Sequence, residues 1–523
     1  MINSEILTYL LLTPIISSIL VLLFKNEQAK LIRWFGVAAS LIAFVISLVA
    51  YTQFDQANPL FQLTHQVVWI KSLNVSYFVG VDGISMLLIL LTTFLTPLTL
   101  LSTWNAIEKN LRMFTFSMLL LEAGMLGVFM SLDLFLFYIF WEAMLIPMYF
   151  IIGIWGGERR IYASIKFFIF TMFGSLLMLV AIIWLAVYAS SITGFFTTNL
   201  LDLYKVGPTV PHQIQAWMFG AFFLSFAIKV PLFPLHTWLP DAHVEAPTAG
   251  SVILAGVLLK MGTYGLVRFC LPLFPQSSVE YAPIISVFAV IGIIYGALVS
   301  MVQTDMKKLV AYSSVSHLGF VVLGIFAMTI ESVQGAVIQM VNHGLSTGAL
   351  FLLVGIAYER THRRDIAFYG GIAKLVPVYS VALMIAVLSS VGLPGLNGFV
   401  GEFLILLGSY KSNVLGSVWF TVFAATGVIF AAVYLLWMYQ RVVFGKVTNH
   451  ELEHELTDMN KREILFLAPI FLFIVWIGVY PSTFLNMTEV SVQTILQQVS
   501  AIFFVNALHR NWCWYCFICY NRN

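Results

Sequence analysis

Residues 229–248, KVPLFPLHTWLPDAHVEAPT, decide how this chain is interpreted. Lys229 ends a long apolar run, and Pro231 and Pro234 follow it at once. Proline inside a helix removes a backbone donor and breaks the hydrogen-bond ladder. A charge beside broken backbone at membrane depth is costly, and it is tolerated mainly where it lines a polar path. The stretch therefore predicts a broken membrane helix beside such a path.

The composition supports a membrane setting for the whole chain. Of its 523 residues, 60% are hydrophobic and only 10% are charged, whereas soluble domains average about 25% charged residues. The net charge of +2 and the absence of a basic cluster give no reason to expect a nucleic-acid partner. Residues 4–24 lack a basic leader and a small-residue cleavage site, so they predict a first transmembrane helix and no removed signal peptide.

Hydrophobic spans of about 20 residues, the length that crosses a bilayer, recur along the sequence. We predict an all-α polytopic membrane protein with fourteen transmembrane helices. They are expected near 4–24, 31–51, 82–103, 111–130, 132–155, 161–188, 214–235, 245–273, 282–303, 308–329, 333–357, 377–410, 415–440 and 463–484. Residues 52–81 mix β-branched and aromatic side chains around Asn74, which predicts a short hairpin on one membrane face.

The distribution of Lys and Arg predicts the orientation. Alternate loops hold 17 of these residues, whereas the opposite loops hold only Lys71, Lys205, Arg268 and Lys411. Positive charge is retained on the cytoplasmic side of a membrane protein. We therefore expect the side with 17 of these residues to be cytoplasmic and both termini to face the other side of the membrane.

A second break resembles the first. At 392–403, GLPGLNGFVGEF interrupts an apolar run with Pro394 and several glycines, and Glu402 stands just beyond. The two broken spans are the seventh and the twelfth predicted helices, five apart, so a repeated five-helix unit must be inverted in the membrane. Paired interruptions of this kind are typical of transporters built from inverted repeats. The predicted units are 1–110 (helices 1–3 with the hairpin), 111–273 (first repeat), 282–440 (second, inverted repeat) and 441–523 (helix 14 and the C-terminal tail).

Four charges fall inside predicted spans. Glu142 lies ten residues into a span starting near Leu132, about 15 Å deep at 1.5 Å per residue. Lys229 and Glu402 adjoin the breaks, and Lys260 lies deep in the eighth span. Each such charge costs about 2.5–3.5 kcal/mol on insertion scales. The sum is comparable to the net stability of a domain, which favours a functional role.

Other interpretations of these charges remain open. Glu142 and Lys229 form either a switchable proton carrier or a buried ion pair that only pins two helices. At 4 Å and an effective dielectric of 20 their attraction is about 4 kcal/mol, enough for a movement of Glu142 to decide whether Lys229 holds its proton. Glu122 is a candidate partner for Lys260 or a second one for Lys229. Lys166 either joins the path or extends to the cytoplasmic surface.

Two histidines continue the series of polar groups. Ser313 and His317 are four residues apart and share a helix face, as do Gln339, His343 and Thr347 on the next span. A single buried histidine is usually only a hydrogen-bonded core residue. Two of them with hydroxyl and amide companions favour a proton relay, because histidine exchanges protons near neutral pH. We expect lateral transfer from Lys229 through Lys260 and the histidines to Glu402.

Sites for redox cofactors are not predicted. No GxGxxG fingerprint or P-loop occurs, so any electron transfer takes place in other subunits. The run Cys513, Cys516 and Cys519 lacks the fourth cysteine and the proline of a ferredoxin motif. The cluster in the opening stretch has metal-ligand chemistry, but we interpret it as a proton-collecting mouth or a solvated loop, and we predict no metal. Its members are His236, Asp241, His243 and Glu245.

Several long stretches carry a family resemblance. They are FYIFWEAMLIPMYFIIGIWGG at 137–157, RRIYASIKFFIFTMFGS at 159–175, VNHGLSTGALFLLVGIAYERTHRRDI at 341–366, and the two broken segments. They resemble the antiporter-like M-type subunits of bacterial NADH:quinone oxidoreductase, respiratory complex I, whose mitochondrial counterpart is subunit 4. The match covers nearly all of 1–500. The segment after about Ser500, ending HRNWCWYCFICYNRN, departs from the pattern and receives no functional residues.

The resemblance implies a function and partners. It implies a proton-translocating membrane-arm subunit that contacts other membrane-arm subunits and lipid and binds no cofactor itself, with NADH, FMN, Fe–S clusters and quinone in partner subunits. It assigns proton translocation to Glu142, Lys229, Lys260, His317, His343 and Glu402. The alternatives are a subunit of a multisubunit Na⁺/H⁺ antiporter, which shares the broken helices and buried lysines, and a passive scaffold that only docks other subunits.

Overall fold

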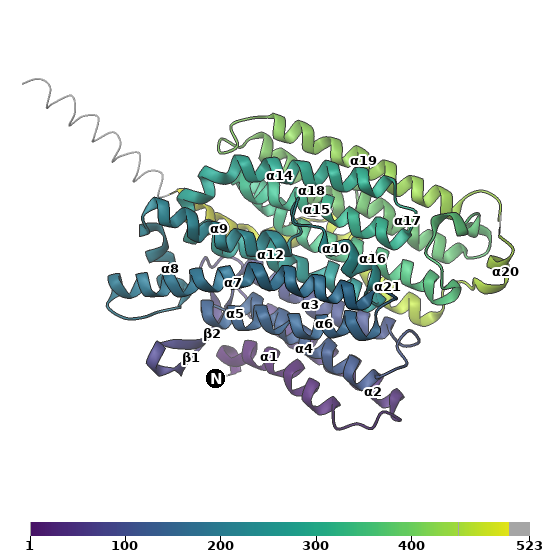
Figure 1. Cartoon of the computed structure of the whole chain (residues 1–523), viewed down its shortest axis with the longest axis horizontal. Coiled ribbons are helices and arrows are strands. Elements are labelled where there is room, and N and C mark those ends of the chain that lie inside the picture. Colours follow the sequence, from purple (N-terminus) through teal and green to yellow (C-terminus); the bar gives the residue numbers. More distant parts are fainter. Residues whose placement is uncertain (1, 448, 501–523) are drawn as a thin grey trace, which may run out of the picture.

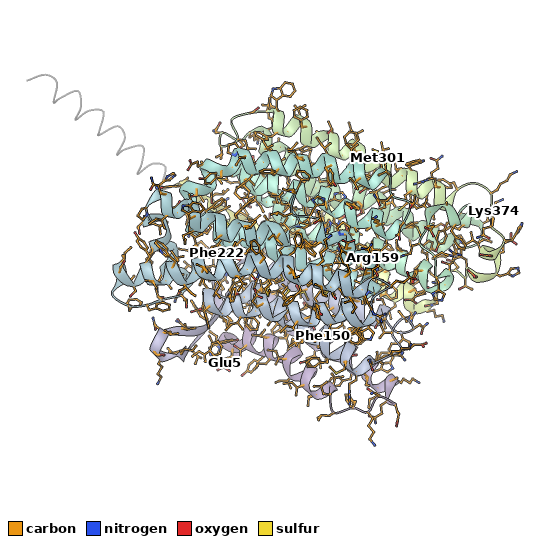
Figure 2. All side chains as sticks on the ribbon, in the orientation of Figure 1. Glu5, Phe150, Arg159, Phe222, Met301 and Lys374 are labelled. Carbon is orange, nitrogen blue, oxygen red and sulfur yellow. The ribbon has the colours of Figure 1, made fainter. Side chains whose placement is uncertain are left out.

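A computed structural model describes residues 2–447 and 449–500 of the chain. Most helices run side by side along the long axis of an elongated bundle, with the N-terminal helices along one side and the later helices along the other (Figure 1). One end carries the hairpin of β1 (Gln62–Ile70) and β2 (Val75–Val81), and the other carries α20 (Glu451–Glu455). We call these the hairpin end and the α20 end. Glu5 lies near the first and Lys374 at the second, while side chains fill the space between the helices (Figure 2).

The elements of the first half are α1 Ile2–Val21, α2 Ala29–Thr52, β1 Gln62–Ile70, β2 Val75–Val81, α3 Gly83–Ser102, α4 Leu111–Met130, α5 Leu134–Ala143, α6 Leu145–Trp155, α7 Arg160–Thr193, α8 Leu200–Val206, α9 His212–Lys229, α10 Trp238–Glu245, α11 Thr248–Ile253, the π-helix η3 Leu254–Leu258, α12 Leu259–Gly265, the π-helix η4 Leu266–Cys270 and α13 Leu271–Leu273. The second half holds α14 Pro275–Met301, α15 Met306–Ala327, α16 Ile330–Thr361, α17 Pro377–Val391, α18 Asn397–Tyr410, α19 Trp419–Val443, α20 Glu451–Glu455 and α21 Lys461–Val479. Short 3₁₀ turns link several of them.

The predicted membrane character agrees with this helical architecture. Among the described residues, 11 helical segments are long and apolar enough to cross a bilayer, and Glu5–Val21 and Pro377–Val391 are shorter apolar helices. The exact number of fourteen spans stays a prediction. Several boundaries differ from the expected ones, since α7 extends to Thr193 and α14 already begins at Pro275.

The hairpin predicted within residues 52–81 is confirmed. β1 and β2 pair antiparallel, with Val67 opposite Tyr77. Asn74 ends the short turn between them in a left-handed conformation, φ 47°, which asparagine tolerates better than most residues. The hairpin is held to the bundle through Tyr77, whose hydroxyl donates to Thr8 over 3.0 Å.

The break predicted after Lys229 is also present. α9 ends at Lys229 and α10 begins only at Trp238, because Pro231 and Pro234 cannot continue the backbone ladder. The freed carbonyl of Ile228 accepts the indole N–H of Trp238 over 2.8 Å. Most of the segment expected as a mouth or solvated loop is instead the helix α10, with Leu239 and His243 buried. The solvated-loop interpretation is therefore wrong.

The second predicted break lies between α17 and α18. Gly392 caps α17 with φ +82°, a conformation that favours glycine. The last transmembrane candidate, α21, packs directly on this break: a Cβ added to Gly478 would lie 2.3 Å from the carbonyl oxygen of Gly395. The backbone of α21 at Gly478 therefore contacts the backbone of the break at Gly395.

A third interruption was not predicted. The span expected at 132–155 is divided at Met144 into α5 and α6. Pro147 explains it, since proline has no N–H to donate to the carbonyl four residues earlier, that of Ala143. Gly124 on α4 lets Met144 approach closely, because an added Cβ would lie 2.8 Å from the Met144 Cβ. Glu142 thus stands beside a helix break, as Lys229 does.

The C-terminal part extends further than expected. Residues 482–500 are helical, beyond the predicted end of the last span at 484. Ser491 Oγ accepts the backbone N–H of Gly83 over 3.0 Å, so this helix covers the start of α3. The cysteine run and the divergent segment after Ser500 lie outside the described residues.

Replacing Gly478 by alanine tests the packing of α21 on the second break. The added methyl group collides with backbone that cannot move aside, so we expect a destabilisation of about 1–3 kcal/mol. Thermal unfolding of the protein in detergent measures it. Gly220→Ala is the matched control, because no atom lies within 4 Å of its added Cβ. Equal stability of the two variants would contradict this packing.

Candidate functional site

Lys260 lies at the centre of the bundle and is fully buried. It follows the π-helix η3, in which the N–H of Leu259 bonds to the carbonyl of Leu254, five residues back. In an α-helix that N–H would bond to Ala255. The Ala255 carbonyl instead accepts the ammonium group of Lys260. The irregular turn thus supplies an acceptor for a buried cation.

From Lys260 a line of polar side chains crosses the second half of the chain. Its ammonium group lies 2.7 Å from His343 Nδ1. The rings of His343 and His317 are 6.0 Å apart, centroid to centroid, and His317 Nδ1 lies 2.9 Å from Glu402 Oε1. All four side chains are buried. The structure therefore brings together four of the six predicted site residues, Lys260, His343, His317 and Glu402.

Further polar groups surround Glu402. Gln339 donates to Glu402 Oε1 over 3.1 Å, and the hydroxyl of Tyr434 lies 3.4 Å from His317 Nε2. Tyr434, on α19, was not predicted, because a tyrosine in an apolar span is ordinarily core. Gly392 admits the carboxylate close to the break, with Glu402 Oε2 3.3 Å from where its Cβ would stand.

Asn397 fixes the start of α18, the helix that carries Glu402. Its backbone carbonyl accepts from Asn342 over 2.7 Å, and its side-chain oxygen accepts from Ser389 and Ser346 over 2.5 and 3.2 Å. Its amide group donates to the Asn342 carbonyl over 3.3 Å. These bonds tie α18 to α16, the helix of His343, and so fix the distance between the helices that carry His343 and Glu402.

Lys229 and Glu142 do not form the ion pair considered above. In the described part of the chain, no carboxylate oxygen lies within 4 Å of the Lys229 ammonium group. That group faces Met144 Sδ at 3.7 Å and the rings of Trp141 and Phe167 at 5.1 and 5.6 Å. Aromatic faces attract a cation through the ring quadrupole. Met144, which lies at the break that was not predicted, is one of the residues around the Lys229 ammonium group.

Two glutamates of the first half differ from Glu402, which is buried and hydrogen-bonded. Glu142 is half-buried beside Tyr138 and Ser175. Glu122 is fully buried, and neither of its oxygens meets a donor among the described residues. No ion pair joins Glu122 to Lys229 or Lys260 in that part of the chain, so the structure does not support the expected partnership.

The polar residues of the opening stretch point to different neighbours. Asp241 forms an ion pair with Lys166 over 2.7 Å. The two residues are 75 positions apart, so the sequence did not predict the pair. Glu245 accepts the backbone N–H of Arg159 over 2.9 Å. His243 stacks on Phe351 at 4.7 Å, and His236 stacks on Phe233 at 5.7 Å. Within residues 2–447 and 449–500 no three metal-ligating side chains come together.

Comparisons with known proteins identify relatives over most of the chain. The family described as "NADH:quinone oxidoreductase/Mrp antiporter, TM" matches residues 131–430. NADH-quinone oxidoreductase subunit M of Rickettsia conorii is 44% identical over 501 residues, covering 95% of this chain and 99% of the relative. A chain of respiratory complex I from Thermus thermophilus with bound NADH superposes with a TM-score of 0.84 at 32% identity, covering 94% of this chain and 99% of that one. A chain of the Mrp complex from Dietzia sp. DQ12-45-1b gives 0.82 at 17% identity, covering 95% and 99%, which shows the fold alone.

Replacing Asn397 by leucine tests the support of α18. The change removes the oxygen that accepts from Ser389 and Ser346, whose hydroxyls can then bond only to each other. One buried hydroxyl is left without an acceptor, at a cost of about 1–3 kcal/mol. We expect a lower unfolding temperature and faster proteolysis of the α17–α18 segment. Asn26→Leu, at an exposed position between α1 and α2, serves as the control. An unfolding temperature of Asn397→Leu equal to that of the wild type would contradict the conclusion that Asn397 fixes the start of α18.

Proposed function

This chain belongs to the NADH:quinone oxidoreductase/Mrp antiporter family, and we infer that it translocates protons as an M-type membrane-arm subunit of an NADH:quinone oxidoreductase. It is a multi-pass protein of the bacterial inner membrane. It is part of an enzyme complex and has no redox site of its own. We propose that NADH, FMN, Fe–S clusters and quinone bind in partner subunits and that other antiporter-like subunits flank this chain.

The buried line of Lys260, His343, His317 and Glu402 carries the proposal. Each neighbouring pair consists of groups that exchange protons, and two of the three contacts are hydrogen-bond distances of 2.7 and 2.9 Å. Imidazole accepts a proton at one nitrogen and releases one at the other. His343 Nε2 has no partner in the described structure and lies on the ring that faces His317. A proton leaving Lys260 can therefore pass along the line to Glu402.

Lys229 supplies this line in the proposed mechanism. The helix of Lys260 packs against the end of α9, since a Cβ added to Gly262 would lie 2.8 Å from the carbonyl oxygen of Phe226. An approaching carboxylate favours the ammonium form of Lys229, and its withdrawal favours release of the proton. Glu142 is half-buried at the protein surface, where a charge on a neighbouring subunit can act on it. Movement of Glu142 then decides when Lys229 loads and releases its proton.

The finer architecture belongs to the same proposal. We propose fourteen spans built from two inverted five-helix repeats at 111–273 and 282–440, flanked by 1–110 and 441–523. Two breaks in corresponding positions support the inversion, at Lys229 and Val391. The excess of Lys and Arg in alternate loops supports a cytoplasmic α20 end and periplasmic termini. Glu402 then releases its proton to the periplasm.

The alternative of a Na⁺/H⁺ antiporter subunit has weaker support. The likeness to the Mrp complex stands at 17% identity, against 32% for the complex I chain of similar fold. Pumping that continues at full rate when choline replaces sodium excludes sodium as the transported ion. A passive scaffold, the remaining alternative, predicts that site variants assemble and pump normally.

Glu142→Gln and Lys229→Ala test the proton route. We expect NADH-driven proton pumping in sealed membrane vesicles to fall several-fold with the complex still assembled, because each change removes a charge on which the loading step depends. The matched controls are Glu280→Gln and Lys411→Ala, which remove exposed carboxylate and ammonium groups held in surface ion pairs. Pumping at the wild-type rate in both site variants would falsify the proposed function.

A further inference from the structure

A buried ion pair stands between Lys260 and the hairpin end, outside the line just described. Arg268, in the π-helix η4, contacts Asp82 Oδ1 at 2.5 Å, and their side chains are only 2% and 7% exposed. The prediction that Arg268 lies in an external loop is therefore wrong. Burying both charges is costly unless their geometry is well satisfied, so the position of this pair calls for a physical reason.

The pair lies on the same helical stripe as Lys260. Lys260, Tyr264 and Arg268 are spaced by four residues and share one face, about 12 Å long at 1.5 Å per residue. The hydroxyl of Tyr264 lies 3.1 Å from Ser85 Oγ and accepts from Arg268 Nε over 3.2 Å. Ser85 in turn donates its backbone N–H to Asp82 over 2.9 Å. Hydroxyl and carboxyl groups therefore extend from the neighbourhood of Lys260 to the hairpin end.

Without Arg268 this stripe has the chemistry of a proton path. Tyr264, Ser85 and Asp82 each accept and donate protons or hold water. Such a path would carry the proton of Lys260 directly out at the hairpin end, and His343 and Glu402 would be bypassed. Arginine prevents this exchange, because the guanidinium group has five donors, no acceptor, and never releases its proton in a protein.

We propose that Arg268, held by Asp82, is the proton barrier that closes the direct route from Lys260 to the hairpin end. Asp82 compensates the guanidinium charge, so that the barrier does not drive the proton off Lys260. The ammonium group of Lys260 points back to Ala255 and sideways to His343, away from the barrier. The rings of Phe61 and Tyr264 cover Arg268 at 4.9 and 5.3 Å and keep the site dry. This proposal rests on the proposed function of Lys260 as a proton carrier.

The passive proton conductance of the reconstituted complex tests the barrier. Purified complex carrying Arg268→Gln is placed in liposomes with a pH-sensitive dye inside. A potassium gradient with valinomycin then imposes a voltage in the absence of NADH. We expect the proton leak to rise several-fold over wild type and the ratio of pumped protons to oxidised NADH to fall. The double variant Asp82→Asn/Arg268→Gln, which leaves no unpaired buried charge, is expected to leak as well and covers the case in which Arg268→Gln fails to assemble.

A second change identifies the route of the leak. Adding Lys260→Met to either variant removes the proton donor, so we expect the leak to return to the wild-type level. Arg360→Gln is the matched control, because it breaks the Arg360–Glu463 pair of 2.8 Å away from this stripe, and it is expected not to leak. A wild-type leak in both Arg268 variants overturns the barrier, as does a leak that persists without Lys260. Lys260→Met alone addresses the proposed function separately, through pumping.

Discussion

Hydrocarbon offers no hydrogen bonds, so every backbone group freed inside a membrane must find a partner within the protein. This constraint governs the two breaks after Lys229 and Val391 and the π-helix η3. The indole of Trp238 occupies the carbonyl of Ile228 at the first break, and Asn397 gathers amides and serines at the second. Around η3 the freed carbonyl of Ala255 takes the ammonium group of Lys260. The groups that repair the backbone are thus the ones that position the charges.

Sequence could predict these features where the signal is local. Prolines and glycines near Lys229 and Glu402 revealed two breaks, and alternating β-branched and aromatic residues revealed the hairpin. Helical spacing placed His317 and His343 on polar faces, and the structure brings them together with Lys260 and Glu402. In each case, chemistry within a few residues determines the conformation or the face.

Contacts between distant spans could not be predicted in the same way. The pairs Lys166–Asp241 and Arg268–Asp82 join residues far apart in the chain, and spacing along one helix says nothing about which neighbour it meets. Glu142 and Lys229 illustrate the reverse error, because opposite charges suggested a pair where the structure gives Lys229 aromatic rings and a methionine. The break at Met144 had a local signal, Pro147, but the surrounding apolar run obscured it.

The packing of α21 across the second break has a consequence for biogenesis. A ribosome that has completed α18 has already made Lys260, both histidines and Glu402, yet the backbone beside Gly395 is still uncovered, because Gly478 is synthesised some 80 residues later. The interior of the second half therefore closes only after the last of the large helices enters the membrane. Until then the polar backbone beside Gly395 lacks the cover that α21 provides. A chain that ends before α21 therefore leaves the second break open, however completely the charged residues behind it have been made.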